Sequence, residues 1–542
     1  MVSKKLDFGA DARLELLKGV EQLNNAVSAT LGPKGRNVVI EKSHGVYSST
    51  KDGVSVAKEV ILEDPLQNAG VQILKEVASQ VNDDAGDGTT TATVLANAIL
   101  TEGYKKVMNG SSPIDLKRGM DIAVEEIVTE LKSTSKDVKN NDEIFQVGTI
   151  SANNDEKVGA LIAEAMDTVG TEGVITVEDS RTAEDSLETV EGMQFDRGYL
   201  SPYFINNQQQ MSVQMEDPQI LLYDGKITSL KPLVKILEYC ISKSAQLVII
   251  ADDIDGEALA GLIVNKARGT LQVAAVKAPG FGDKKSANLE DIAVLTGATV
   301  ISTKKGMKLE KVTGQEFGTC KSITVTSKQT TIVDGSGSTE AIEGRIEEIK
   351  TLIDNADSAY EVEGLQERLG KMAGGVAILR IGAESELELN EKKDRVEDAL
   401  AATRAAVDEG IVPGGGIALM RASDKLLKEC FQNEDQELGY NIIAKACKSP
   451  FNTIIKNAGS NSGEVIWTKI SGEESSIGWN VATDEACDMF EQGIIDPTRV
   501  TRTALEKAAS VAGTMLITEC VITKLPKDNE KEELPAGGFG MM

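Results

Sequence analysis

Gly86-Asp87-Gly88-Thr89-Thr90-Thr91 separates two segments of helical spacing, residues 66–81 and 89–108. Together with residues 83–85, this stretch is too polar and glycine-rich for a helix or a strand, so we expect a loop there. Its glycines let backbone N–H groups converge, the helix start that follows can bind phosphate, and Asp87 offers an oxygen ligand for Mg²⁺. The motif predicts a phosphate site, but an ordinary capped helix start fits it about equally well.

Outward from this motif, apolar residues keep a helical period in both end regions of the chain, as at 10–31, 113–132 and 395–520. The middle of the chain instead alternates short apolar runs with helical stretches, as βαβ units do. We therefore predict a multidomain α and α/β protein in which both chain ends build a helical domain and an α/β domain is inserted between them. The apolar runs are residues 221–223, 247–250 and 273–276, and the helical stretches between them are 231–243 and 256–268.

The composition narrows the class of protein. The formal net charge of −28 argues against a nucleic-acid partner, because such proteins gain affinity by neutralising phosphates with Lys and Arg. Six scattered cysteines without a CxxC pair, and a single histidine, His44, make a zinc site improbable. The N-terminus lacks a signal-peptide pattern and no apolar run is long enough to span a bilayer. We expect a cytoplasmic protein of the bacterial type that does not bind membranes.

Several further segments could serve a nucleotide, although each has an ordinary alternative. No GxxxxGK[ST] sequence and no strand-linked GxGxxG are present, which disfavours a P-loop ATPase and a Rossmann enzyme. Lys51-Asp52-Gly53 places a carboxylate on a tight turn, and Asp398 lies within a helical run. Taken singly, the first is usually only a turn and the second only a solvated helix face.

The motifs in combination resemble those of the group I (GroEL-type) chaperonins, over essentially the whole chain. The resemblance implies an ATP-hydrolysing chaperone that forms rings and folds other proteins. It also implies a division into an equatorial ATP-binding domain (1–135 and 410–526), an intermediate hinge domain (136–191 and 375–409), an apical substrate-binding domain (192–374) and a disordered tail (527–542). The motifs are Leu31-Gly32-Pro33-Lys34-Gly35, Lys51-Asp52-Gly53, Gly86–Thr91, Ala278–Asp283, Val412–Gly416 and Ala509–Gly513.

The resemblance also assigns roles to individual residues of an ATP, Mg²⁺ and K⁺ site. Asp52 and Asp398 would be catalytic and orient the attacking water, with Asp398 reaching the phosphate only after the hinge domain swings toward it. Asp87 would bind Mg²⁺, and Thr30, Lys51 and Thr90 would surround K⁺. The remaining cofactor-binding residues would be Leu31, Gly32, Pro33, Gly53, Gly88, Thr89, Thr91, Ser151, Gly415, Asn480, Ala482 and Asp496.

Apolar residues of the α/β segment form stripes that would ordinarily be core. The resemblance implies instead that part of them line a rim that captures unfolded client proteins and accepts a lid co-chaperonin, because an exposed apolar patch normally has a binding role. The matching residues are Tyr199, Tyr203, Phe204, Leu233, Val234, Leu237, Leu259, Ile263 and Val264.

The chain departs from the family pattern where two rings would meet. Asn452 and Asn461 stand where the family has an Arg and a Glu, so a seven-membered ring could be single or double. Three other functions stay open on the sequence: a ring that binds proteins but hydrolyses ATP poorly, a metabolic kinase or ligase, and a structural shell protein. The first is disfavoured by the intact Asp52, Asp87 and Asp398. The second would need an acid/base pair outside the nucleotide motifs, and the third would not need the Gly86–Thr91 loop.

Overall fold

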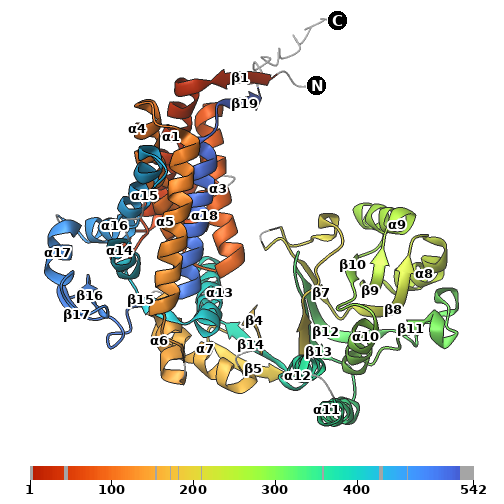
Figure 1. Cartoon of the computed structure of the whole chain (residues 1–542). Helices are drawn as coiled ribbons and strands as arrows, with labels where there is room; N and C mark the ends of the chain where they lie inside the picture. The colour runs from red at the N-terminus through yellow and green to blue at the C-terminus, as the bar shows by residue number, and fades with distance from the viewer. Residues whose placement is uncertain are drawn as a thin grey trace, which may run out of the picture. The chain divides into compact units, whose positions relative to one another are not determined.

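A computed structural model describes residues 4–41, 47–138, 140–152, 155–170, 173–180, 182–208, 210–356, 359–426, 431–460 and 462–524 (Figure 1). The chain forms two compact units, one from residues 1–163 and 384–542 and the other from residues 164–383. The mixture of a helical part and an α/β part is as predicted. The three-domain division stays a prediction, and the predicted tail and Asn461 lie outside the described residues.

The first unit is a bundle of long helices with a continuous apolar core. Helix α18 packs against α3, α4 and α5, and Figure 1 shows these helices running lengthwise together. Several starts follow local sequence rules, since Asp64 and Ser112 cap helices whose first residue is proline. The helices are α1 (Gly9–Ser28), α2 (Gly53–Glu59), α3 (Pro65–Ala85), α4 (Thr89–Met108), α5 (Pro113–Thr134), α6 (Asn141–Ser151), α13 (Glu386–Glu409), α14 (Ile417–Asp424), α15 (Glu434–Ala446), α16 (Ser449–Asn457), α17 (Gly463–Ile470) and α18 (Thr498–Leu516).

Two local expectations for this unit are wrong. Residues 83–85 are the last turn of α3 and not loop, because Gly86 ends the helix in the left-handed region and polar residues are tolerated at a helix end. Residues 395–520 are not helical throughout, because short two-stranded sheets interrupt them. The antiparallel pairs of the unit are β1 (Lys4–Phe8) with β19 (Cys520–Lys524), β2 (Val38–Glu41) with β3 (Tyr47–Thr50), β15 (Ile411–Pro413) with β18 (Ile495–Pro497), and β16 (Ile477–Asn480) with β17 (Glu485–Asp488).

The second unit contains the predicted βαβ units. Strands β8 (Gln219–Ile227), β9 (Leu247–Ile254) and β10 (Val273–Lys277) are parallel, with α8 (Val234–Lys243) and α9 (Gly256–Ala267) between them in sequence. The eight-stranded sheet runs β10-β9-β8-β12-β13-β6, with β11 beside β8 and β7 beside β12. Its other strands are β6 (Gly192–Phe195), β7 (Val213–Glu216), β11 (Ile301–Ser302), β12 (Gly318–Val325) and β13 (Thr330–Gly335).

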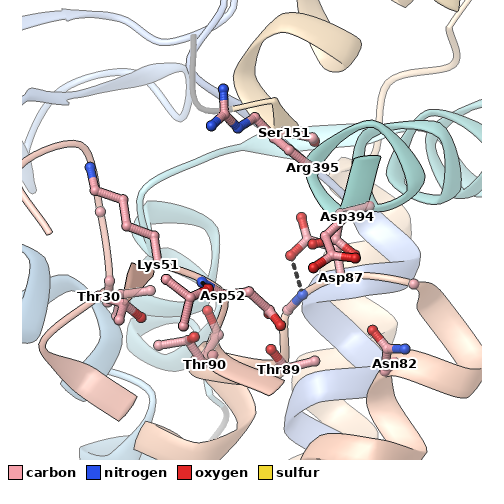
Figure 2. A pocket seen from close by; sticks show the side chains of 18 of the residues that line it. Thr30, Lys51, Asp52, Asn82, Asp87, Thr89, Thr90, Ser151, Asp394 and Arg395 are labelled. Atoms are coloured by element: carbon pink, nitrogen blue, oxygen red, sulfur yellow. Dashed lines mark hydrogen bonds between the residues drawn. The ribbon is translucent and has the colours of Figure 1, made fainter. Parts of the chain in front are cut away.

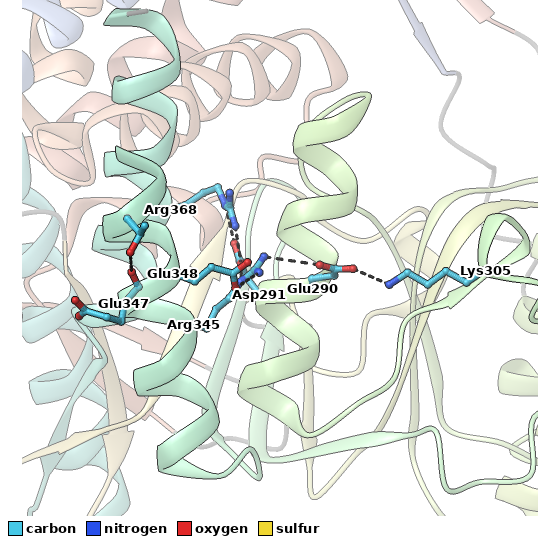
Figure 3. A network of polar contacts seen from close by, with 8 residues as sticks. Glu290, Asp291, Lys305, Arg345, Glu347, Glu348 and Arg368 are labelled. Carbon is cyan, nitrogen blue, oxygen red and sulfur yellow. Dashed lines mark hydrogen bonds and ion pairs between the residues drawn. The ribbon is translucent and has the colours of Figure 1, made fainter. Parts of the chain in front are cut away.

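Three helices and a small sheet complete the second unit. Strands β4 (Val174–Asp179), β14 (Val376–Ile381) and β5 (Ser186–Val190) form a three-stranded sheet in that order. Helix α7 (Glu156–Val169), which precedes β4, spans the boundary between the two units. Helices α10 (Asp283–Thr296), α11 (Thr339–Asp354) and α12 (Ala359–Ala373) are held together by a buried carboxylate, Asp291, which accepts hydrogen bonds from Arg345 and Arg368 (Figure 3).

Candidate phosphate and metal site

The loop between α3 and α4 leaves the first turn of α4 open to a ligand. Gly86 and Gly88 both adopt positive φ, +72° and +86°, a conformation that favours glycine. Gly88 is the N-cap of α4 and has no side chain with which to bind the first-turn N–H groups. These N–H groups therefore remain available to an anion, where the helix dipole adds further attraction.

The start of a second helix meets the start of α4. Asp52 caps α2: its Oδ1 accepts from the Val54 N–H at 3.0 Å and its Oδ2 from the Ser55 N–H at 2.7 Å. A Cβ placed on Gly53 would lie 2.1 Å from Thr90 Oγ1, so the two helix starts are in close contact. The local sequence thus makes Lys51-Asp52-Gly53 a helix N-terminus that fixes both oxygens of Asp52.

Helix α13 closes another side of the site. A Cβ placed on Gly86 would lie 2.0 Å from the Ala401 Cβ, which shows how closely α13 packs on the α3–α4 loop. Glu391, Asp394, Arg395 and Asp398 of this helix line the same pocket (Figure 2). Asp398 therefore already lies at the site in this structure, without the hinge motion expected from the sequence.

The resulting pocket encloses about 180 Å³, less than the ~300–1,000 Å³ typical of sites that hold a whole small ligand. It contains most of the predicted cofactor residues, and Figure 2 shows their side chains gathered around it. From the prediction, the pocket is lined by Thr30, Leu31, Gly32, Lys51, Asp52, Gly53, Asp87, Gly88, Thr89, Thr90, Thr91, Ser151 and Asp398. Pro33, Gly415, Asn480, Ala482 and Asp496 are not among its lining residues.

Six lining residues were missed: Thr50, Asn82, Gly86, Glu391, Asp394 and Arg395. A usable signal existed for those of α13. Residues 391, 394, 395 and 398 share one face of a helix, so identifying Asp398 could have led to the other three. Thr50 and Asn82 carried no such signal, because they reach the pocket only through the folding of β3 and α3.

The pocket has an excess of negative charge. Burial raises the pKa of Asp87 above the usual range, and the negative charge of Asp52 raises this pKa further. Burial raises the pKa of Asp398 still more, with Asp87 and Asp52 as the next causes. Arg395 offsets only part of this charge, because its guanidinium lies 3.1 Å from Glu391 and 3.7 Å from Asp155. A bound cation would relieve the repulsion.

The donor set fits Mg²⁺ shared with a polyphosphate. Within the described part of the chain, no group of three or more His, Cys, Asp or Glu side chains is arranged to hold a metal by itself. Mg²⁺ does not require one, because it usually takes one or two carboxylates, water and phosphate oxygens. Asp87, beside the open N-terminus of α4, is placed to supply the carboxylate.

The predicted nucleoside contacts lie in a neighbouring part of the same unit. Asp496 pairs with Val412 across β18 and β15 and accepts a hydrogen bond from the Gly415 N–H. Burial, with Asp87 as the second cause, raises the pKa of Asp496 to about 7, which places its carboxyl within the electrostatic reach of the pocket. Asn480 accepts the Ala482 N–H at 2.9 Å in the β16–β17 turn. Contacts of Pro33 and these four residues with a nucleoside stay a prediction.

The predicted client-binding residues divide by exposure. Tyr203, Val234 and Val264 are exposed, at 76%, 39% and 46%. The others pack into or against the core of the second unit: Phe204, Leu233 and Leu237 are buried there, and Tyr199, Leu259 and Ile263 are partly buried against it. One further exposed apolar residue, Ile241, lies seven positions after Val234, so the two share a face of α8. Exposed apolar residues of this unit are thus present on α8, on α9 and in the segment that contains Tyr203.

A helical unit built from both chain ends, an inserted α/β unit and a glycine-lined anionic pocket together fit the chaperonin class. The model of the TCP-1/cpn60 chaperonin family matches residues 23–526. The chain therefore belongs to the TCP-1/cpn60 chaperonin family, whose members are ATPases.

A solved structure agrees with this assignment at the level of the fold. The crystal structure of the chaperonin gp146 from the bacteriophage EL 2 (Pseudomonas aeruginosa), determined in the presence of ATP-BeFx, is 23% identical with a TM-score of 0.68. The match covers 95% of this chain and 98% of that chain. The described part of this chain contains no helix long and apolar enough to cross a membrane.

Proposed function

We propose that this chain is the subunit of an ATP-driven chaperonin ring that captures non-native proteins on exposed apolar residues and encloses them for folding. The pocket formed by α2, α4 and α13 is the observation that carries the proposal. It combines free helix N–H groups, glycines that permit close approach and several carboxylates, which is what a metal-bound polyphosphate requires. The ring and the client proteins are inferred from membership of the chaperonin family.

In this proposal the phosphates lie against Gly88 and the first turn of α4, where Thr89, Thr90 and Thr91 add hydroxyl groups. Asp87 holds Mg²⁺, which neutralises charge that develops on the phosphate oxygens. Thr30, Lys51 and Thr90 surround K⁺. The cofactor-binding set is completed by Leu31, Gly32, Pro33, Gly53, Ser151, Gly415, Asn480, Ala482 and Asp496.

Asp52 and Asp398 have different roles because their surroundings differ. Both oxygens of Asp52 accept N–H groups of α2, so this carboxylate is fixed in place and orients the attacking water. The raised pKa of Asp398 suits its carboxylate to accept a proton. We assign to Asp398 the acceptance of the water's proton.

Client proteins would bind to the exposed apolar residues of the second unit, which contains the whole of the proposed apical domain. Tyr203, Val234, Ile241 and Val264 offer the same chemistry as the side chains that a non-native protein exposes. A lid co-chaperonin with an apolar loop could occupy the same residues. The acidic composition of the chain would then suit the wall of a water-rich chamber.

The proposal is tested by ATP turnover of the purified full-length chain with Mg²⁺ and K⁺, together with suppression of aggregation of a denatured test protein. Asp398→Ala should reduce phosphate release by roughly 10²–10⁴-fold, the contribution typical of a positioned base. ATP binding should be retained or stronger, because one negative charge leaves the pocket.

Asp408→Asn is the matched control, since Asp408 lies on the same helix but pairs with Arg499 at the protein surface. This variant should hydrolyse ATP at the wild-type rate. Unchanged turnover in Asp398→Ala would remove the assigned role of Asp398. A wild-type chain that binds denatured protein without hydrolysing ATP would favour a binding ring in place of an ATPase.

A further inference from the structure

A second hollow lies in the α/β unit and is lined mainly by side-chain amides. It encloses about 550 Å³, and its carboxamides come from Asn206, Asn207, Gln208, Gln214, Gln246 and Gln272. Glu216 adds one carboxylate, and the described lining contains no lysine, arginine or aromatic residue. The hollow therefore suits neither phosphate, which needs cations, nor a nucleobase, which stacks on aromatic rings. It suits a neutral ligand that both donates and accepts hydrogen bonds.

The sheet fixes the position of two of these amides. Gln246 and Gln272 directly precede the parallel strands β9 and β10, and the Leu247 N–H donates to the Gln272 carbonyl at 2.9 Å. Oε1 of Gln246 is buried and has no hydrogen-bond partner among the described residues. A buried acceptor without a partner destabilises the fold unless a ligand donor satisfies it.

The hollow already contains an example of the recognition that we infer. The Asn206 side chain donates from Nδ2 to the Gln214 carbonyl at 2.7 Å and accepts the Gln214 N–H on Oδ1 at 2.9 Å. One carboxamide thus pairs with both main-chain groups of a residue in β7. A glutamine side chain of a bound polypeptide offers the same two kinds of group, a carbonyl acceptor and an N–H donor.

The chain connects the hollow to the exposed apolar residues. Asn206 follows Tyr203 by three residues, and Lys266 of α9 donates to the Tyr203 and Ile205 carbonyls at 3.1 and 2.9 Å. This contact fixes the segment that leads into the hollow against the helix that bears Val264. Gln272, on the other side, follows the end of α9 at Ala267 by five residues.

We infer that this carboxamide hollow is a polar subsite for client proteins, which binds the side-chain amides of an extended polypeptide whose apolar side chains contact Tyr203 and Val264. The inference rests on the proposed client-binding function. If the subsite exists, the preferred clients contain two apolar side chains followed by an uncharged segment that is rich in side-chain amides. Acidic segments are excluded, because their carboxylates would meet Glu216 and the described lining contains no lysine or arginine.

The test measures fluorescence anisotropy of two labelled peptides with the full-length chain. The amide probe has two leucines followed by four glutamines, and the apolar probe has two leucines followed by four alanines. Gln246→Leu combined with Gln272→Leu should weaken binding of the amide probe by roughly 10-fold, the loss of one or two hydrogen bonds. Binding of the apolar probe should not change.

Stability distinguishes this loss from damage to the fold. Gln246→Leu removes a buried acceptor that lacks a partner, so its Tm should equal or exceed that of the wild type while its affinity for the amide probe falls. Gln272 is exposed, so the single variant Gln272→Leu should fold normally and give a smaller loss. Gln329→Leu, at an exposed glutamine of the same unit outside the hollow, is the matched control and should bind both probes as the wild type does.

The outcomes separate the two proposals. Equal affinity of the amide probe for the wild type and the double variant, with normal binding of the apolar probe, overturns the polar subsite alone. Val264→Glu should weaken both probes, and Leu352→Glu, at a leucine of α11 with similar exposure, should weaken neither. If the wild type binds neither probe, both the subsite and the proposed client-binding face are wrong.

Discussion

Protonation of Asp496 should make the stability of the fold depend on pH. Its pKa in the folded chain is raised to about 7, whereas an aspartate in an unfolded chain has a pKa near 3.9. The folded state therefore binds the proton more tightly, so stability is lost as the pH rises from about 4 to about 7 and the loss is complete above that range. This is the expected behaviour of a buried carboxyl, and the nearby Asp87 adds to the effect.

Asp496→Asn should remove this pH-dependent loss. Without nucleotide, the variant should match the wild type near pH 4 and be more stable by roughly 1–3 kcal/mol above pH 7, because the asparagine Oδ1 still accepts the Gly415 N–H but carries no charge. Thermal unfolding between pH 4 and pH 8 checks this expectation. A stability difference that is the same at both ends of the range would contradict the raised pKa.

At the scale of helices and strands, the sequence was most informative where local rules decide the structure. The βαβ alternation and the helices that begin at Pro65 and Pro113 follow from periodicity and capping. The β16–β17 hairpin was missed because each strand has four residues, too few for a period to be recognised. Burial also escaped prediction, since Val234 and Leu237 lie in the same apolar stripe but differ in exposure, 39% against 6%.

The residues of the candidate site also differ in whether a local sequence pattern could identify them. Gly86–Thr91 could be identified locally, because its glycines and threonines fit a helix start that binds phosphate. The contribution of α13 could be reached only through Asp398, which the resemblance supplied, because Glu391 and Asp394 become relevant only when Ala401 packs on Gly86. That contact joins residues more than 300 positions apart, and no local pattern encodes it.

The contact between helices α10, α11 and α12 leads to a prediction about stability. Asp291 is nearly fully buried, and its side chain is the shared acceptor for Arg345 and Arg368, which are also largely buried (Figure 3). Asp291→Ala would leave the two guanidinium groups without the buried carboxylate that they share, and Arg345 would keep only the more exposed Glu290 and Glu348. We expect it to destabilise the second unit by roughly 3–5 kcal/mol and to accelerate hydrogen exchange in α11 and α12.

Two variants check that the effect comes from the unpaired charges. Glu347→Ala removes a carboxylate of α11 that is 73% exposed and pairs with Lys350, so it should change stability by less than roughly 1 kcal/mol. Replacing Asp291 by Leu and both arginines by Met should cost less than Asp291→Ala alone, because no charge is then left buried. A larger cost for the triple variant would mean that the network itself stabilises the fold.

At the scale of the whole molecule, the proposed ring depends on contacts between chains. Asn452, which stands where the resemblance to the group I chaperonins implies an Arg, lies on α16. Its Oδ1 is 2.0 Å from the place that a Cβ on Gly463 would occupy, so its amide packs at the start of α17. An uncharged, half-buried residue here cannot form an ion pair with a second ring. Each exposed ion pair contributes only ~0–1 kcal/mol, but a seven-membered ring would lose the contribution seven times.

We therefore expect a native mass of about seven chains, both without nucleotide and with Mg-ATP and K⁺, measured by sedimentation or native mass spectrometry. Restoring the charges with Asn452→Arg and Asn461→Glu should shift the mass toward fourteen chains at low salt, and high salt should reverse the shift because exposed ion pairs are screened. Asn452→Arg alone is the control and should stay at seven chains, since the added cation has no acidic partner.

A native mass of fourteen chains in the wild type would mean that other contacts hold two rings together. A mass of one chain in both states would overturn the ring, and with it the enclosure of clients.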